Sequence, residues 1–235
     1  MMASPTFHFA GQQNSFILVG DNVVDKGICD EIISLCVKHY DDLFYPGPTL
    51  GGVNISTKSS MDCDFGAESL ANKGYDPEPW GTYESILTEA LTTIISEYQS
   101  NFYDLWHVPN LLDTGLRLQH YVKNYGYYRN HIDGCVWGPV SSRNRIFGAC
   151  IYLNDVDSGG ETHFPLQGQK VEAKAGRVAL FPAAWTHPHA GMPSHSADKW
   201  MVSSFITCVP DDDALEYDIE SGEMKSPNKE SGEDT

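Results

Sequence analysis

His131 and Asp133 stand two positions apart in the segment "HIDG" and could hold a metal ion together. On a β-strand, residues i and i+2 point to the same face, so this imidazole and this carboxylate would converge. The pair alone is common by chance and becomes specific only with a third ligand from a neighbouring strand. Two histidines and one carboxylate on one face of an octahedron leave three positions open, as in non-haem Fe(II) oxygenases. Zinc hydrolases also use two histidines and a carboxylate.

A later segment, "FPAAWTHPHAGMPSHSADKW" (181–200), carries three histidines that could supply the third ligand. His187 and His189 would share one face of a strand, which leaves a supporting role open for His187. His195 falls in a predicted turn. Lys199 is the one lysine of the segment, and taken alone it is typical of a surface charge at the start of a strand.

Helical periodicity appears twice in the first half of the chain. The segment 25–40 has apolar residues at helical spacing and Asp25 as its N-cap. The segment 82–103 repeats an apolar face over its whole length and is the best helix of the sequence. Between them, the polar stretch 41–80 contains Gly, Pro and Ser, and it predicts long loops with one short strand.

The period changes to two after the second helix. In the segment 116–122 two sets of side chains alternate, which predicts a strand. Further strands are predicted at 145–153, 170–175, 177–182 and 199–208, with turn sequences between them. Helices followed by a run of short strands favour an α+β fold that is mainly β, with the N-terminal helices packed on one face of a β-sandwich or barrel.

These strands carry sequence blocks that together resemble the catalytic domain of the prolyl 4-hydroxylases, a branch of the Fe(II)/2-oxoglutarate dioxygenase superfamily. The blocks are "RIFGACIYLNDVDSGGETHFP", "VEAKAGRVALFP" and "HAGMPSHSADKW", which follow the HxD pair in the family's order. The resemblance extends from about Leu116 to Cys208. It fits the first 115 residues only loosely, as the family's N-terminal helices. It implies a double-stranded β-helix core (jelly-roll, cupin-like).

The resemblance also implies which residues form the site. The family's second histidine ligand directly precedes Ala-Gly, which selects His189 and gives a metal triad of His131, Asp133 and His189. Lys199, ten residues after His189, corresponds to the cation that holds the C5 carboxylate of 2-oxoglutarate. A buried carboxylate needs such a partner.

Two tyrosines of this chain also correspond to family residues, and two other positions differ from the family pattern. Tyr128 corresponds to a tyrosine beside the metal, and Tyr121 to one that hydrogen-bonds the cosubstrate, although its spacing is one residue longer here. Either ring could instead be a core aromatic. Family members often carry threonine at the position of Gly148, with its hydroxyl towards the C5 carboxylate, and tryptophan at the position of Phe205. The hold on 2-oxoglutarate is therefore expected to rest mainly on the lysine.

The implied reaction is hydroxylation of a peptidyl prolyl residue, coupled to decarboxylation of 2-oxoglutarate by O₂ to succinate and CO₂. Fe(II) is the implied metal, and ascorbate the implied reductant of oxidised iron. The implied partner is a protein or peptide that contains proline. Substrate choice is expected in loops around the barrel mouth. These are the segment from about 45 to 80 and "CVWGPVSSRN", whose Trp137 could stack on a prolyl ring.

Three other hypotheses about the function stay open at this point. The same chemistry could act on another side chain, a free amino acid or a small metabolite. The barrel could be a non-catalytic binding module, although such a module does not require three metal ligands and the lysine. A zinc hydrolase would leave the lysine and the "GGET" motif unexplained.

Composition limits the partners and the organisation of the chain. The formal net charge is −17, and no cluster of Lys and Arg is present, which argues against nucleic acid. Six cysteines without a CxxC pair favour a reducing setting. With no evident signal peptide or membrane span, we expect a cytoplasmic protein. We expect one domain over residues 1–210, with helical support to about 115 and the catalytic β-core at about 116–209.

The last segment, 211–235, holds ten acids and two lysines, with few large apolar residues. Such a composition cannot bury enough apolar surface to offset the entropy of ordering. We expect an acidic disordered tail. The oligomeric state is left open by the sequence.

Overall fold

The structure, a computed structural model, describes residues 3–102, 111–134, 144–208, 216–218 and 223–225. Its helices are α1 (Lys26–Lys38), α2 (Tyr40–Leu43), α3 (Ala67–Ala71) and α4 (Trp80–Asn101), with a short 3₁₀ turn at Gln13–Ser15. Its strands are β1 (Thr6–Phe9), β2 (Leu18–Asp21), β3 (Tyr45–Pro46), β4 (Pro48–Thr49), β5 (Gly52–Val53), β6 (Lys58–Ser59), β7 (Met61–Phe65), β8 (Leu111–Asp113), β9 (Leu116–Tyr121), β10 (Tyr127–His131), β11 (Arg145–Tyr152), β12 (Thr162–Phe164), β13 (Gln169–Val171), β14 (Val178–Pro182), β15 (His189–Gly191), β16 (Lys199–Cys208), β17 (Glu216–Asp218) and β18 (Glu223–Lys225).

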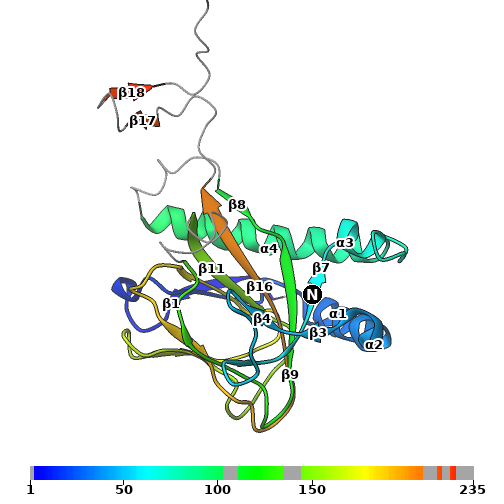
Figure 1. The fold of residues 1–235 in the computed structure, drawn as a ribbon. Helices are drawn as coiled ribbons and strands as arrows, with labels where there is room; N and C mark the ends of the chain where they lie inside the picture. Colours follow the sequence, from blue (N-terminus) through cyan, green and yellow to red (C-terminus); the bar gives the residue numbers. More distant parts are fainter. Residues whose placement is uncertain (1–2, 103–110, 135–143, 209–215, 219–222, 226–235) are drawn as a thin grey trace, which may run out of the picture.

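Two antiparallel sheets of unequal size form the barrel, and the helices lie outside it (Figure 1). The large sheet has the order β1-β2-β14-β11-β16-β9-β7-β3, and β8 pairs with the end of β16. The small sheet has the order β13-β12-β15-β10-β6. Apart from these, β4 pairs with β5 and β17 with β18. This is the double-stranded β-helix with flanking helices that the sequence predicts.

Each central strand of the large sheet turns one face to the helices and the other to the barrel interior. In β11, Phe147, Ala149 and Ile151 join the core that contacts the helices. Cys150 and Tyr152, on the opposite face, join a second core with residues of the small sheet. The alternation follows from the period of two in a strand. Because of this alternation, every second side chain of the large sheet faces the barrel interior and can contribute to a site there.

The two helices predicted from periodicity are confirmed. α1 begins after Asp25, whose Oδ1 accepts hydrogen bonds from the backbone N–H groups of Gly27 (2.8 Å) and Ile28 (3.3 Å). This N-cap satisfies two donors that the first turn leaves unpaired. α4 buries one face, at Leu87, Leu91, Ile94 and Tyr98, in the core it shares with the large sheet. Both helices therefore brace the back of the sheet that carries Lys199.

The N-terminal segment contributes strands as well as helices, and these strands were not predicted from the sequence. β1 and β2 form a hairpin, and β2 pairs with β14 at the edge of the large sheet. Periodicity gave no signal because each of these strands is only four residues long. The region before residue 116 is therefore a mixture of helices and sheet edge.

The expectation for residues 41–80 was wrong. This stretch contains two short helices and five strands, four of which have only two residues. β7 pairs with β9 along its whole length, and β6 pairs with β10. Two-residue strands are set by their neighbours in the sheet, because they are too short to show a period of their own. The segment thus belongs to the barrel wall.

The C-terminal segment was expected to be disordered from 211 to 235. Six of its residues instead form β17 and β18, which pair as a two-stranded hairpin. The rest of that segment lies outside the described residues. Among the helices of the described chain, none is long and apolar enough to cross a bilayer.

Candidate functional site

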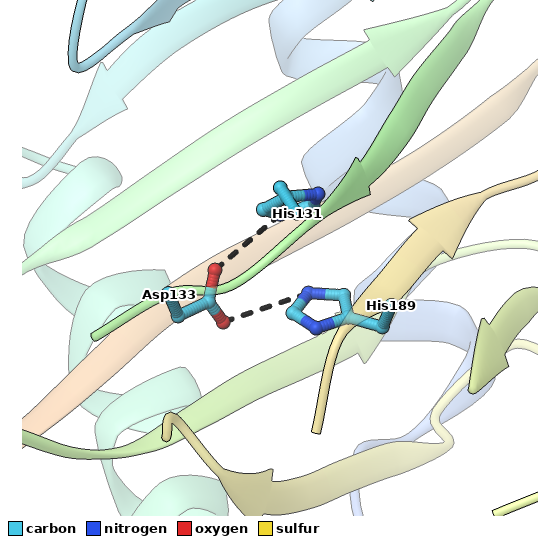
Figure 2. Close-up of side chains that lie close together, drawn as sticks. All are labelled: His131, Asp133 and His189. Atoms are coloured by element: carbon cyan, nitrogen blue, oxygen red, sulfur yellow. Dashed lines mark ion pairs between the residues drawn. The ribbon is translucent and has the colours of Figure 1, made fainter. Parts of the chain in front are cut away.

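Three side chains meet at one place (Figure 2), two from neighbouring strands of the small sheet and one from just beyond the end of β10. His131 ends β10 and lies directly opposite His189, the first residue of β15. Asp133 places Oδ1 3.4 Å from Nε2 of His131 and Oδ2 3.6 Å from Nε2 of His189. The three ligand atoms lie within 4.8 Å of one another. Ligands about 2.1 Å from one octahedral ion lie about 3 Å apart, so this spacing suits a single metal.

The local backbone differs from the expectation in one respect. His131 and Asp133 were expected to share one strand face, but β10 ends at His131 and Asp133 lies in the turn beyond it. The turn is held in place, because the backbone N–H of Gly134 donates to the carbonyl of Ala183 (2.8 Å) and an Arg145 Nη1 donates to the carbonyl of Asp133 (3.0 Å). The convergence therefore comes from this turn, and the pleat of a strand does not explain it.

Both histidines are already oriented to bind a metal through Nε2. Nδ1 of His131 lies 2.8 Å from the carbonyl oxygen of Arg129, and Nδ1 of His189 lies 3.1 Å from that of His187. A carbonyl oxygen only accepts, so each Nδ1 carries the proton and donates. The unprotonated nitrogen of each neutral ring is then Nε2, which faces Asp133. Such outer hydrogen bonds fix the ring and raise its basicity as a ligand.

The electrostatics of the triad favour a neutral imidazole beside an ionised carboxylate. Burial lowers the pKa of His189, and this outweighs the attraction of Asp133. For Asp133, burial opposes ionisation, but His189, His131 and Arg145 together hold the pKa of the carboxyl below its usual value. These are the protonation states that metal binding requires.

One cavity of about 820 Å³ joins all six residues that the resemblance assigned to the site. Its lining includes the triad together with Lys199, Tyr121 and Tyr128. A cavity of this size accommodates a small dicarboxylate and part of a second molecule.

Lys199 lies at the start of β16 and is almost completely buried, with 1% of its surface exposed. Its ammonium donates to the carbonyl of Gly160 (3.0 Å) and forms no ion pair with a described carboxylate. Glu161, which attracts it electrostatically, pairs with Lys170 instead. Burial lowers the pKa of Lys199 to about 8. An unpaired ammonium buried beside a metal triad calls for an anionic ligand.

The two tyrosines line the same cavity in different ways. The Tyr128 ring stacks on His131, with 3.6 Å between ring centroids and 20° between the planes. The Tyr121 ring lies under the Lys199 ammonium, 4.5 Å from Nζ, and its hydroxyl donates to Oε1 of Gln119 (3.1 Å). Tyr128 thus supports a triad histidine, and Tyr121 supports the lysine.

The remaining histidines of the C-terminal segment lie outside the triad. His187 uses both ring nitrogens, with Nε2 2.9 Å from the carbonyl of Ser15 and Nδ1 2.9 Å from the hydroxyl of Thr186. His195 contacts Asn124 through Nδ1 (3.1 Å). Neither has a nitrogen in the metal cluster. Trp137, the other residue singled out for substrate contact, lies outside the described residues.

The two departures from the family pattern have local structural consequences. A Cβ on Gly148 would lie 2.3 Å from Oδ2 of Asp133 and 2.7 Å from the Phe181 ring. A Cβ of threonine here would therefore lie against the carboxylate of the triad. The Phe205 ring lies 3.5 Å from the guanidinium carbon of Arg145, the residue that holds the Asp133 turn.

Among the polar residues of the cavity wall that sequence reasoning missed is Lys58, which forms an ion pair with Asp62 behind it. Both residues lie in the stretch that was expected to be loop. A lysine and an aspartate four residues apart in a polar segment carry no signal of burial, so the sequence offered no means of finding them.

Comparison with known proteins agrees with this geometry. Residues 116–207 match the family model of the 2OG-Fe(II) oxygenase superfamily. A protein of Acanthamoeba polyphaga mimivirus named "Putative prolyl 4-hydroxylase" is 35% identical over 113 residues. The aligned part covers 42% of this chain and 46% of the viral protein, so the chain spans about half the length of this relative.

Two solved structures show the same fold. The viral collagen prolyl hydroxylase of Paramecium bursaria Chlorella virus-1, in its 2OG complex, is 17% identical with a TM-score of 0.57, over 85% of this chain and 98% of that one. A Trichoplax adhaerens prolyl hydroxylase, in complex with a hypoxia-inducible factor peptide fragment, is 16% identical with a TM-score of 0.65, over 83% and 85%. Residues 116–207 of this chain thus match the model of the 2OG-Fe(II) oxygenase superfamily, and the chain shares the fold of these two prolyl hydroxylase structures.

Proposed function

We propose that the protein is an Fe(II)- and 2-oxoglutarate-dependent dioxygenase that hydroxylates a prolyl residue of a protein or peptide. The observation that carries this proposal is the buried ammonium of Lys199, which has no carboxylate partner among the described residues and lies in the same cavity as His131, Asp133 and His189. A metal triad alone suits several metalloenzymes, but a dicarboxylate with one end on the metal requires a cation at its other end.

The charges of the cavity support a dianionic cosubstrate. Fe(II) and Lys199 would bring three positive charges to the metal position and the cosubstrate subsite, against the three negative charges of Asp133 and 2-oxoglutarate. Arg145, Glu68, Glu84 and the Arg117–Asp64 pair also line the cavity. The other buried ammonium of the wall, Lys58, is neutralised by Asp62 and leaves this balance unchanged. A site that excludes water is most favourable when its charges cancel.

The residues of the chain have separate tasks in this mechanism. His131, Asp133 and His189 would hold the iron as its three protein ligands, and the metal would bind the cosubstrate and O₂. When bound, the metal supplies the redox chemistry that couples decarboxylation of 2-oxoglutarate to hydroxylation. Lys199 would bind the C5 carboxylate and so fix the orientation of the keto end. Tyr128 would restrain His131, and the buried wall around Lys199 would exclude water.

A peptide is the substrate that the relatives support. The Trichoplax structure holds a peptide fragment, and the viral relative carries the name of a prolyl 4-hydroxylase. In this chain, residues 48–51 of the β4–β5 hairpin and Gly115–Arg117 also line the cavity, beyond the metal ligands. These segments would contact the substrate. Ascorbate is a further expectation, as the reductant that restores oxidised iron.

Succinate formation tests the proposal directly. Purified protein is incubated with Fe(II), ascorbate and 2-oxoglutarate, with and without proline-rich peptides, and succinate and the peptide mass are measured. Peptide-stimulated succinate, together with one added oxygen on a proline, is the expected result. Peptides with alanine in place of proline serve as the matched control. No succinate in any reaction would contradict the proposal.

The same experiment tests the alternative substrate class. If the rate of succinate formation is unaffected by every peptide but rises with free amino acids or small metabolites, the chemistry stands and the prolyl assignment is wrong. The motif residues and the cavity serve both substrate classes, so product mass is the deciding measurement.

A further inference from the structure

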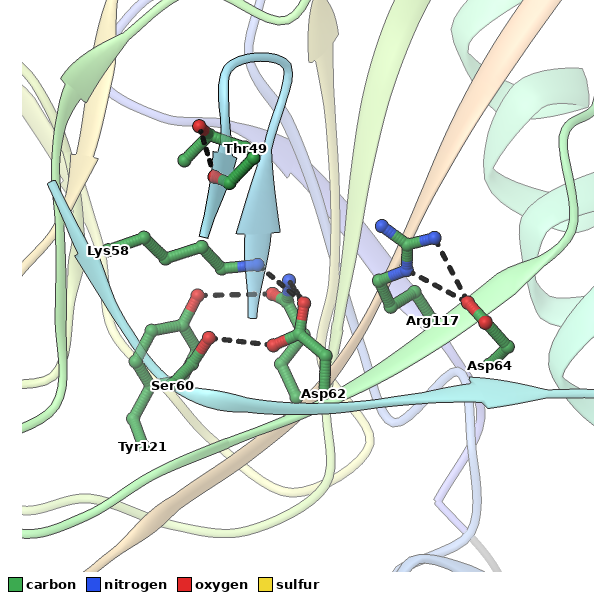
Figure 3. Close-up of polar contacts among 9 residues, drawn as sticks. Thr49, Lys58, Ser60, Asp62, Asp64, Arg117 and Tyr121 are labelled. Carbon is green, nitrogen blue, oxygen red and sulfur yellow. Dashed lines mark hydrogen bonds and ion pairs between the residues drawn. The ribbon is translucent and has the colours of Figure 1, made fainter. Parts of the chain in front are cut away.

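A second buried ammonium, that of Lys58, lies on the wall of the cavity (Figure 3). Its side chain is 3% exposed, and that of Asp62 is fully buried. Nζ of Lys58 donates to Oδ2 of Asp62 (2.6 Å), and the hydroxyl of Ser60 donates to Oδ1 (2.6 Å). Lys58 differs from Lys199 in having its own carboxylate.

The ion pair joins the two sheets of the barrel. Lys58 belongs to β6 of the small sheet, where it pairs with Tyr128 of β10. Asp62 belongs to β7 of the large sheet, where it pairs with Gln119 of β9. The pair therefore connects the strand that carries His131 with the strand that carries Tyr121.

On the large sheet, a chain of hydrogen bonds runs from the ion pair to Tyr121, which with Lys199 forms the floor of the cavity. Nε2 of Gln119 donates to Oδ2 of Asp62 (3.4 Å), and Oε1 of Gln119 accepts from the Tyr121 hydroxyl (3.1 Å). The order is fixed, because an ionised carboxylate only accepts and so draws the amide N–H₂ of Gln119 towards itself. The amide oxygen must then face Tyr121. The tip of the Tyr121 ring is anchored, and the face of that ring supports Lys199.

On the small sheet, the same pair reaches the metal triad. Nζ of Lys58 lies 5.4 Å from the centroid of the Tyr128 ring, within the range of a cation–π contact. That ring stacks on His131. The ion pair thus contacts Tyr128, beside the metal position, directly and is linked to Tyr121, beside the cosubstrate lysine, through Gln119.

Stability alone is a weak reason for such a pair. Burying two charges costs about as much as their attraction returns, and apolar residues of similar volume often serve equally well in a core. This pair lies on the wall of the candidate site, where orientation matters more than stability.

We propose that Lys58, Asp62 and Gln119 are positioning residues for the cosubstrate subsite. Acting through Tyr121, they fix the surface on which the Lys199 ammonium rests, and thereby the direction of its free N–H groups. The inference rests on the proposed function, because it concerns binding of 2-oxoglutarate.

The test separates cosubstrate binding from folding and from metal binding. The double variant Lys58→Met/Asp62→Leu removes both charges and keeps similar volumes. Binding of 2-oxoglutarate to the Mn(II)-loaded protein is measured by calorimetry without O₂, and Mn(II) binding and the thermal midpoint are measured in parallel. We expect a Kd for 2-oxoglutarate that is about tenfold higher, with Mn(II) affinity and thermal midpoint close to wild type.

A second variant guards against failure of the first to fold. Gln119→Met keeps the ion pair but removes the link to Tyr121, and it should raise the Kd for 2-oxoglutarate to a similar extent. The matched control is Lys26→Met, which breaks the exposed ion pair of Lys26 with Asp155 and should leave every value unchanged.

The outcomes distinguish the two proposals. Wild-type affinity for 2-oxoglutarate in the folded double variant, or in Gln119→Met, would overturn the positioning role and leave the proposed function intact. Absence of 2-oxoglutarate binding in the Mn(II)-loaded wild type would overturn the proposed function, and this inference with it.

Discussion

The two buried lysines of the cavity, Lys199 on its floor and Lys58 on its wall, are alike in type and burial but differ in their partners. Lys58 is 2.6 Å from a carboxylate oxygen, whereas the hydrogen bond of Lys199 among the described residues goes to a neutral carbonyl. Burial lowers the pKa of both ammonium groups, and Asp62 opposes this effect at Lys58.

The difference separates a structural cation from a receptor for an anion. An ammonium with a built-in carboxylate has its charge compensated in every state of the protein. An ammonium without one is destabilising until a ligand supplies the charge. Burial alone would have given both lysines the same role, so the partner is the informative observation.

The proposed role of Lys199 as an anion receptor assumes a metal ion bound in the same cavity. Removal of a metal ligand should therefore have the largest effect of all the substitutions. Asp133→Ala leaves two neutral imidazoles and removes the only anionic ligand of the triad. We expect loss of stoichiometric iron binding and of succinate formation, measured by metal analysis and turnover. His195→Ala, a histidine outside the triad, is the control and should keep both. Iron bound normally by Asp133→Ala would refute the site.

Lys199→Met tests the receptor directly. The C5 carboxylate would lose its cation, so we expect the Kd for 2-oxoglutarate to rise about 100-fold, equivalent to about 3 kcal/mol. The free protein should become more stable, by up to about 3 kcal/mol, because an uncompensated buried charge is removed. Urea unfolding and calorimetry measure the two effects. An unchanged Kd would count against the role of Lys199.

Lys58→Met should change stability in the opposite direction. Asp62 would be left buried without its cation, and breaking such a pair typically costs about 3 kcal/mol or more. The free energy of unfolding should therefore fall, measured in urea at the same pH as Lys199→Met. If both substitutions shift stability in the same direction, the distinction between the two lysines is wrong.

The pH dependence gives the smallest effect. The folded-state pKa of Lys199 is about 8, below the unfolded value, because of burial. The ammonium is thus present below pH 8 and is lost above it, so affinity for 2-oxoglutarate should be level below pH 7.5 and fall about tenfold per pH unit above 8. The contribution of Lys199 to stability has the opposite sign. It rises from pH 8 to about 10.5, where the unfolded chain binds more protons. A flat binding profile to pH 9.5 would contradict the assignment.

The sequence predicted those parts of the fold that lie in long regular segments or carry a motif. The strand expected at 199–208 is β16, whose ten residues include β-branched and aromatic side chains typical of strands. The helix at 25–40 was marked by both its apolar spacing and its cap. The candidate site residues were identified from a sequence motif. They are separated in the sequence, and the barrel fold brings them close together.

The parts that were missed depend on contacts between distant segments. Lys58 is buried because β6 lies beside β10, and nothing in its neighbouring residues records that. The position of Asp133 in a turn depends on Arg145, 12 residues further on, and on Ala183, which is distant in the sequence. The contact that a side chain at Gly148 would make with Asp133 emerged only from the register of β11 in the sheet.

The backbone bonds that orient His131 and His189 have a consequence for the proposed metal site. Each ring is oriented by a carbonyl two residues earlier in its own chain segment, so this orientation does not depend on a bound ion. If the site holds iron as proposed, an ion lost through oxidation could be replaced without refolding of the protein. A chelated sample should keep its circular dichroism spectrum and regain full occupancy when Fe(II) is returned.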